Sequence, residues 1–319
     1  MIKKTLYFEN PAYLSFKNKQ LVIKLPEIEK NDTLPDLFKA ECVKTIPIED
    51  IGVIILDNKQ ITLTHGLIEN LLENNCAIVT CGSNHLPVGL LLPLEGNTLQ
   101  NERFTAQIEA SLPLKKQLWQ QTIQAKIENQ ANVLKNAGIE KCRNVEIRNM
   151  LKWASDVRSG DSDNLESRAA VYYWKNLFPD IEGFVRGREE MPPNNLLNYG
   201  YAILRAVVAR SLVASGLLPT LGIHHHNRYN AYCLADDIME PYRPFVDKLV
   251  VEMINQYELQ ITNYELTKDV KARLLQIPVL DVKIDGQRSP LMVAVGQTTA
   301  SLAKCFLGES RKIVYPNLE

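Results

Sequence analysis

The change of hydrophobic pattern near Gly96-Asn97 constrains the fold of this chain more than any other feature. Before this turn signal the apolar residues come in short β-branched runs, and after it they recur at helical spacing. Arginine follows the same division, because the first one is Arg103 whereas lysine occurs throughout. We therefore expect an α+β protein, with a small β-rich N-terminal domain at residues 1–96 and a larger all-α C-terminal domain at residues 97–319.

The first domain is expected to consist mostly of strands, at residues 5–8, 13–16, 20–24, 51–56, 77–80 and 88–92. Lys17-Asn18-Lys19 is typical of a hairpin turn, and an amphipathic pattern predicts a helix over residues 64–73. This domain contains no catalytic constellation.

The second domain is expected to be helical at residues 98–135, as one helix or a pair, and at residues 143–155, from 164 onward, and 195–215. Asn129 and Gln130 in the first of these segments are expected to be buried and hydrogen-bonded. The 319 residues, of which 45% are hydrophobic, are enough to bury a sizeable core.

The overall charge and the cysteines exclude some classes of protein. A net charge of −1 favours no particular partner, and the six scattered cysteines fit neither a zinc knuckle nor a CxxC redox pair. We interpret them as reduced thiols of a cytoplasmic protein. The sequence shows no signal peptide and no apolar run long enough to cross a membrane.

Residues 222–247 are the strongest candidate for a functional site. They contain three of the five histidines, followed by Asp236, Asp237 and Glu240. Nitrogen and carboxylate donors together suit a catalytic divalent metal. In a helix over residues 231–240 either aspartate shares a face with Glu240, and two prolines, at 241 and 244, should end this helix at Glu240 and restart one near Arg243. An exposed histidine loop beside a solvated acidic face explains the same residues without a metal.

Glu166 is a second candidate. It shares a helix face with two alanines and Tyr173, so that another helix can approach closely where the carboxylate projects. The competing interpretation is a capping box, in which Asp163 is the N-cap residue and Glu166 returns to the start of the helix. Downstream, Arg186 and Arg188 lie in a glycine-containing segment that suits phosphate contact, although surface ion pairs explain them equally well.

Four motifs in order then resemble one family. They are Leu165-Glu166-x-x-Ala-Ala-x-x-Tyr, Asn194-Asn195-Leu-Leu-Asn-Tyr-Gly-Tyr-Ala, Leu221-Gly-Ile-His224-His225 and Leu234-Ala-Asp-Asp237-Ile-Met-Glu240-Pro-Tyr-Arg243-Pro. Together they resemble CRISPR-associated protein one, the adaptation endonuclease and integrase, over nearly the whole chain. The ESRAAVYYW and LGIHHHNRYN forms resemble its type II branch, found beside CRISPR-associated protein nine.

The resemblance implies a site and a reaction. Its metal ligands fall on Glu166, His225 and Glu240, with Asp237 at the alternative acidic position and His224 and His226 as misaligned candidates within the triplet. The implied cofactor is Mg²⁺ or Mn²⁺. The implied reaction is phosphoryl transfer, in which the 3′-hydroxyl of a short DNA fragment attacks a phosphodiester of the CRISPR repeat and no residue serves as nucleophile.

The resemblance also implies partners. Double-stranded DNA would meet Arg186, Arg188, Arg228 and Arg243, and two tyrosines, Tyr229 and Tyr232, would stack on bases or pack in the protein. The β-rich domain would form a homodimer, which joins CRISPR-associated protein two in a hetero-hexamer and allows contact with other type II adaptation proteins. Two alternatives remain open: a DNA-binding scaffold with a vestigial metal site, and a general metal-dependent nuclease.

Overall fold

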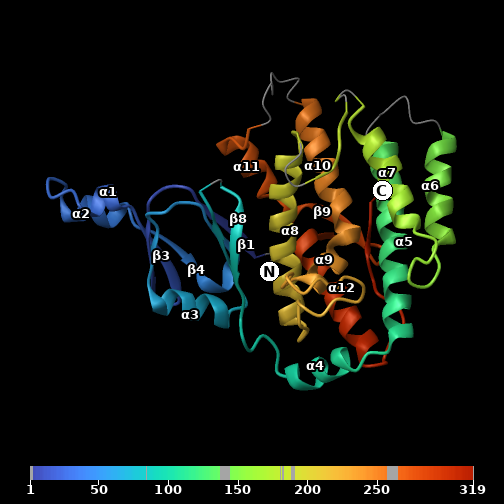
Figure 1. The fold of residues 1–319 in the computed structure, drawn as a ribbon. Coiled ribbons are helices and arrows are strands. Elements are labelled where there is room, and N and C mark those ends of the chain that lie inside the picture. The colour runs from blue at the N-terminus through green and yellow to red at the C-terminus, as the bar shows by residue number, and fades with distance from the viewer. Residues whose placement is uncertain are drawn as a thin grey trace. The chain divides into compact units, whose positions relative to one another are not determined.

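The computed structural model describes residues 3–83, 85–136, 144–179, 181, 183–187, 191–256 and 265–318. Contacts between residues divide the chain into two compact units, Met1–Gly96 and Asn97–Glu319. Figure 1 traces both, and each is described by itself below.

The first unit contains a mixed four-stranded sheet in the order β1-β5-β7-β8. Its strands are β1 (Lys4–Phe8), β5 (Ile51–Leu56), β7 (Ala77–Cys81) and β8 (Pro87–Leu91). The first three run parallel and β8 returns antiparallel to β7, which leaves β1 and β8 as the edges. All six residues of β5 are buried, as expected of a continuous β-branched run in the middle of a sheet.

A second sheet and one helix complete this unit. The sheet has the order β4-β3-β2-β6, from β4 (Lys44–Pro47), β3 (Gln20–Lys24), β2 (Tyr13–Lys17) and β6 (Thr62–Leu63). The turn between β2 and β3 is a tight hairpin, because Asn18 and Lys19 both have positive φ, at 51° and 61°. Apolar residues of both sheets and of α3 (His65–Glu73) form one core, which includes Leu14, Leu21, Ile54, Leu67, Leu71 and Ile78.

The second unit is largely helical. Its helices are α4 (Gln100–Ile108), α5 (Leu112–Asn136), α6 (Asn144–Asp156), α7 (Leu165–Leu177), α8 (Asn194–Ala214), α9 (Cys233–Met239), α10 (Arg243–Gln256), α11 (Lys268–Leu274) and α12 (Leu291–Phe306). Residues 98–135 are therefore a pair of helices. Helix α8 ends within one residue of the expected position, and Gly216, whose φ is 67°, follows its C-cap. Helix α5 packs against α6, α7 and α10 and is central to the site (Figure 1).

The expectation of an all-α second domain was wrong in one respect. A small three-stranded sheet in the order β10-β9-β11 is formed by β9 (Asp281–Ile284), β10 (Gln287–Pro290) and β11 (Pro316–Asn317). These strands are two to four residues long: β9 and β10 form an antiparallel hairpin, and β11 adds the third strand by pairing with β9. Strands this short carry little alternation that a sequence pattern could reveal.

Short elements were also missed elsewhere. In the first unit these are β4, β6, α1 (Pro26–Glu29), α2 (Asp36–Glu41) and a 3₁₀ turn η1 (Ile48–Asp50). In the second unit these are two further 3₁₀ turns: η2 (Glu240–Tyr242) joins α9 to α10, and η3 (Ile277–Val279) joins α11 to β9. Among the described residues no helix is both long enough and apolar enough to span a membrane.

Candidate metal centre

A single lysine joins two of the three ligands that the sequence suggested. Lys126 lies on α5, and its Nζ is 2.6 Å from Glu166 Oε1 and also 2.6 Å from Glu240 Oε2. Burial alone would lower the pKa of Lys126, but the carboxylates of Glu240 and Glu166 outweigh burial and raise it above the ordinary value. The two acids therefore face each other across one ammonium group.

The start of α7 directs Glu166 toward this lysine. The backbone N–H groups of Leu165 and Glu166 donate to the Asp161 carboxylate at 2.9 and 3.0 Å. Asn164, at the N-cap, has a φ of 52° and its side chain makes no capping hydrogen bond. The capping box of Asp163 with Glu166 is therefore not formed, and that alternative was wrong. Because Asp161 satisfies the helix start, the Glu166 carboxylate is available to Lys126.

Glu240 lies where one helix ends and the next begins. Helix α9 stops at Met239, the 3₁₀ turn η2 follows, and α10 starts at Arg243, which is the break that the prolines predicted. The Glu240 side chain is only 4% exposed, and Arg243 Nη2 lies 3.0 Å from its Oε1. Burial alone would raise the pKa of Glu240, but Arg243 and Lys126 lower it below the ordinary value. Glu240 is therefore a buried carboxylate held in its charged form.

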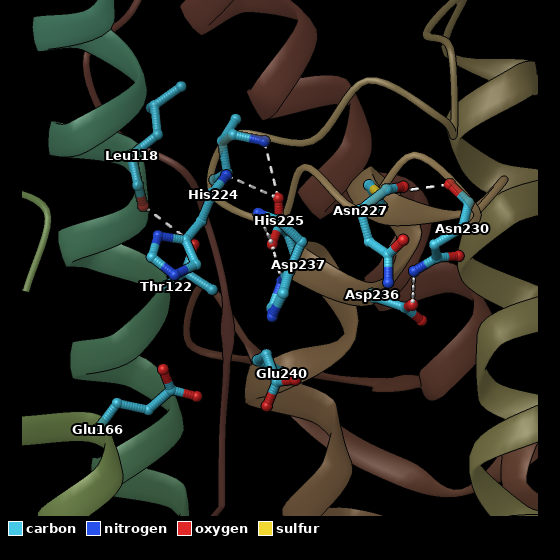
Figure 2. Close-up of polar contacts among 12 residues, drawn as sticks. Leu118, Thr122, Glu166, His224, His225, Asn227, Asn230, Asp236, Asp237 and Glu240 are labelled. Atoms are coloured by element: carbon cyan, nitrogen blue, oxygen red, sulfur yellow. Dashed lines mark hydrogen bonds and ion pairs between the residues drawn. The ribbon is translucent and has the colours of Figure 1, made fainter. Parts of the chain in front are cut away.

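Asp237 orients His225. The Nδ1 atom of the imidazole lies 2.5 Å from Asp237 Oδ1, and this hydrogen bond raises the pKa of His225 although partial burial opposes it. Since the buried carboxylate holds a proton on Nδ1, we infer that Nε2 carries the free lone pair when the ring is neutral. In Figure 2 the side chains of Glu166, His225 and Glu240 border the same space.

The loop before α9 is folded around the same aspartate. The backbone N–H groups of Ile223 and His224 donate to Asp237 Oδ2 at 2.7 and 2.9 Å, and that of His225 donates to Oδ1 at 3.2 Å. Gly222 makes room for this arrangement, because a Cβ there would lie 2.3 Å from the His225 carbonyl oxygen and 2.8 Å from Asp237 Oδ2. The Leu-Gly-Ile-His-His motif thus encodes a turn that wraps a carboxylate.

The three histidines have different surroundings. The His224 ring stacks on Trp119 of α5, with centroids 4.1 Å apart and planes 2° from parallel. Burial and the neighbouring His225 lower the pKa of His224. His226 is exposed. Of the triplet, His225 alone has a ring nitrogen on a buried carboxylate among the contacts of the described residues.

Comparison with known proteins gives the family. The model of the family described as CRISPR associated protein Cas1 matches residues 6–277. The chain belongs to this family. A CRISPR-associated endonuclease Cas1 from Neisseria meningitidis serogroup C (strain 8013) is 35% identical over 301 residues, which cover 94% of this chain and 91% of that relative. The predicted family is thus confirmed, and with it the function of a CRISPR-associated endonuclease.

Solved structures share the fold. A casposase bound to integration product superposes with a TM-score of 0.77 at 21% identity, and the match covers 98% of this chain and 92% of the other. A Cas6-RT-Cas1–Cas2 complex gives a TM-score of 0.70 at 19% identity over 97% of this chain and 35% of that one. These likenesses confirm the predicted α+β class.

The residues present suit the divalent metal that the Cas1 family implies. Among the described residues no three His, Cys, Asp or Glu side chains already form a metal-binding cluster. The chemistry of the donors nevertheless fits. A cation, the Lys126 ammonium, already lies between the two carboxylates, 2.6 Å from an oxygen of each. Two carboxylate oxygens and one imidazole nitrogen are donors that Mn²⁺ accepts well, while Mg²⁺ prefers oxygen alone.

The two aspartates that precede Glu240 are both engaged elsewhere. Asp237 receives the hydrogen bonds of the His225 loop, so that it orients a ligand. Asp236 accepts from Arg205 and Asn230, at 2.7 Å each. Glu240 is therefore a better candidate than Asp237 for the third ligand.

The four arginines suggested for DNA contact differ in their availability. Arg228 is exposed and stacks on Tyr229, with its guanidinium carbon 4.5 Å from the ring centroid. Arg186 donates to Asn194 and Asn198 at 2.9 and 2.8 Å. Arg243 is held by Glu240 as described above. Arg188 lies outside the described residues.

Sequence reasoning missed Lys126 and Asp161 as site residues. A lysine on an amphipathic helix is usually solvated. The available signal was its position seven residues after Trp119, on the same face of α5 as the buried Ile123 and Ile127. Asp161 precedes the helix by four residues, and its capping role depends on the αL conformation of Asn164, which no pattern indicated.

Proposed function

We propose that this chain is a metal-dependent integrase that inserts short double-stranded DNA fragments into a CRISPR repeat array. The observation that carries the proposal is the Lys126 ammonium held between the Glu166 and Glu240 carboxylates, beside an imidazole oriented by Asp237. Glu166, His225 and Glu240 are the residues that would hold Mg²⁺ or Mn²⁺. When bound, the ion supplies Lewis acidity at the scissile phosphate.

The protein's own groups position the reaction. Glu166 and Glu240 approach from separate helices, and Asp237 presents the Nε2 atom of His225 toward them. No side chain is needed as a nucleophile, because the 3′-hydroxyl of the fragment attacks the repeat phosphodiester in line. Water in place of that hydroxyl gives endonuclease activity, and reversal of the attack gives disintegration of a branched product.

DNA binding is assigned mainly to phosphate contacts near the site. Arg228 and Tyr229 are exposed next to the His225 loop, where a guanidinium can meet a phosphate and a phenol ring can stack on a base. Arg186, Arg188 and Arg243 remain candidates. Binding of this kind should weaken as salt rises.

We further propose that residues 1–96 form a homodimer and that the dimer assembles with CRISPR-associated protein two. A solved complex whose name includes Cas1 and Cas2 shares the fold of this chain. Exposed apolar side chains in this unit support an interface, among them Leu37, Val88 and Leu94. The motif forms favour the type II branch. A gene neighbourhood without CRISPR-associated protein nine would count against that branch.

The test is a strand-transfer assay with two variants. Glu166→Gln and His225→Ala should lower integration of a labelled fragment into a repeat-bearing supercoiled plasmid by at least about 10²-fold with Mn²⁺ present. Binding of the fragment should stay within about twofold of wild type, since neither side chain neutralises a phosphate. His226→Ala is the matched control, because it removes an exposed neighbouring imidazole.

Two outcomes would contradict the proposal. Undiminished integration by both variants would indicate a scaffold whose metal site is vestigial. Cleavage without joining, on plasmids with or without a repeat, would indicate a general nuclease.

A further inference from the structure

Lys126 occupies a position that an ordinary structural lysine does not. Its side chain is 10% exposed, and its ammonium contacts two carboxylates from different helices at 2.6 Å each. Two carboxylates that close together repel each other unless a cation separates them. The lysine is therefore the group that offsets the repulsion between the two acids in the absence of a metal ion.

No other cation among the described residues bridges this pair. Arg243 contacts Oε1 of Glu240, whereas Lys126 contacts Oε2, and among the ion pairs of the described residues Arg243 has none with Glu166. Its guanidinium lies over the Tyr201 ring, with the carbon 4.9 Å from the centroid. Arg243 therefore stabilises one carboxylate from the side, while Lys126 fills the space between both.

We propose that Lys126 is a positioning residue that acts as a tethered counter-cation, which keeps Glu166 and Glu240 in place until a divalent ion displaces its ammonium. This inference rests on the proposed function. It adds that the chain carries its own competitor for the metal, so that the affinity for the ion reflects an exchange of one cation for another. The lysine opposes metal binding although it prearranges the ligands.

A second observation shows where the displaced ammonium can go. Gln130 lies one helical turn after Lys126 on α5, is 3% exposed, and its Oε1 atom is buried without a hydrogen-bond partner. Side chains four apart on a helix are neighbours. An unsatisfied buried acceptor is costly, and a cationic donor repays that cost better than a neutral one. Gln130 Oε1 is thus a ready acceptor for the ammonium once the metal binds.

The experiment titrates the full chain with Mn²⁺ alone, without DNA, by calorimetry. Lys126→Met should bind Mn²⁺ about tenfold more tightly than wild type, because no cation has to leave. The metal-free variant should melt several degrees lower, because Glu166 and Glu240 lose their shared counter-cation. Lys116→Met, which removes a lysine from an exposed position of the same helix, should match wild type in both measurements.

Two further variants keep the inference falsifiable if the methionine variant does not fold. Lys126→Arg retains the charge and should bind Mn²⁺ no more tightly than wild type. Gln130→Leu leaves the ion pairs intact but removes the acceptor, so it should bind Mn²⁺ about threefold more weakly. Unchanged affinity in Gln130→Leu would overturn the role of Gln130.

The failure of this inference can be told from the failure of the proposed function. If wild type binds Mn²⁺ and Glu166→Gln abolishes the binding, the metal site stands. Weaker or unchanged binding by Lys126→Met would then overturn the counter-cation alone. If wild type itself shows no binding of Mn²⁺ or Mg²⁺, the metal site fails, and the counter-cation fails with it.

Discussion

At the scale of single residues, Asp237 is the acid near the site that organises the His225 loop through hydrogen bonds. Three backbone N–H groups and the His225 ring donate to its two oxygens, and its side chain is fully buried. An asparagine has one acceptor and would turn an NH₂ group toward donors. The role of Asp237 is therefore to hold both the loop and the imidazole of His225 in place.

We expect Asp237→Asn to bind Mn²⁺ about 10- to 100-fold more weakly, because the His225 ring loses its orienting carboxylate. Calorimetry without DNA measures this directly. Asp236→Asn is the matched control, since it changes an adjacent buried aspartate whose partners are Arg205 and Asn230. Equal affinity of both variants and wild type would contradict the orienting role.

Asp247 on α10 predicts a pH dependence. Burial raises the pKa of Asp247 from 3.8 to about 6. The hydroxyls of Tyr173 and Tyr201 donate hydrogen bonds to its carboxylate and lower the pKa, but burial outweighs them. Because the folded state holds this proton more tightly than the unfolded state, the contribution of protonated Asp247 to stability is fully present below about pH 4 and is lost as the pH rises through about 6.

Asp247→Asn should remove this fall, which is roughly 2–3 kcal/mol of unfolding free energy for a shift of this size. Urea unfolding of wild type and variant between about pH 4 and pH 7 gives the difference curve. Asp163→Asn, at an exposed position, should leave the wild-type profile unchanged. Parallel profiles for wild type and Asp247→Asn would show that Asp247 ionises normally.

Single residues also show which parts of the site could be predicted from the sequence. Glu166, His225 and Glu240 could be proposed from motif positions, but the choice between Asp237 and Glu240 depends on which carboxylate is already filled by N–H groups. Likewise Asn129 is buried and hydrogen-bonded as expected, whereas Gln130 Oε1 has no partner. Spacing places a residue on a face, but it does not say what lies opposite.

At the scale of elements, the loop between α8 and α9 depends on Gly222. Gly222→Ala would force its new methyl group against the His225 carbonyl oxygen and Asp237. We expect a loss of at least about 2 kcal/mol in unfolding free energy, because a backbone atom cannot move aside cheaply. Denaturant unfolding of wild type and Gly222→Ala measures this difference in unfolding free energy.

Gly66→Ala is the control for that variant. Gly66 lies in α3 with no atom within 4 Å of the added methyl group, so alanine should be neutral or slightly stabilising there. A small effect at Gly222, similar to that at Gly66, would mean that the loop adapts and that the turn is not tight.

Most long elements followed the sequence pattern closely, but the 16-residue helix α12 was missed together with the short elements. The strands β1, β2, β3, β5, β7 and β8 and the long helix α8 lie within a few residues of their expected positions. Strongly periodic runs specify such elements locally. Strands β9 and β11 pair only because the end of the chain returns to them, and that contact is tertiary.

At the scale of the whole molecule, the proposed homodimer can be tested at an edge strand. Val88 of β8 is 70% exposed, and β8 pairs on one side only among the described strands. Val88→Lys should weaken dimerisation at least about tenfold, because an interface formed at the edge strand β8 would bury the charge of the lysine. Sedimentation velocity over a concentration series measures the dissociation constant.

Val171→Lys is the control for the dimer. It places the same charge at an exposed valine of α7, in the second unit, and should leave the dissociation constant unchanged. A Val88→Lys protein that dimerises like wild type would move the interface away from β8.

The Asn129 side chain connects three distant parts of the second unit. It donates to the carbonyl oxygens of Pro241 and Pro316, at 2.8 and 3.0 Å, and accepts from the Leu318 N–H at 2.9 Å. The tail at 316–318 is thus fastened to the same helix that carries Lys126, and to the turn that carries Glu240. A displacement of residues 316–318 would therefore be transmitted through one amide group both to the helix of the lysine and to the turn of the buried glutamate.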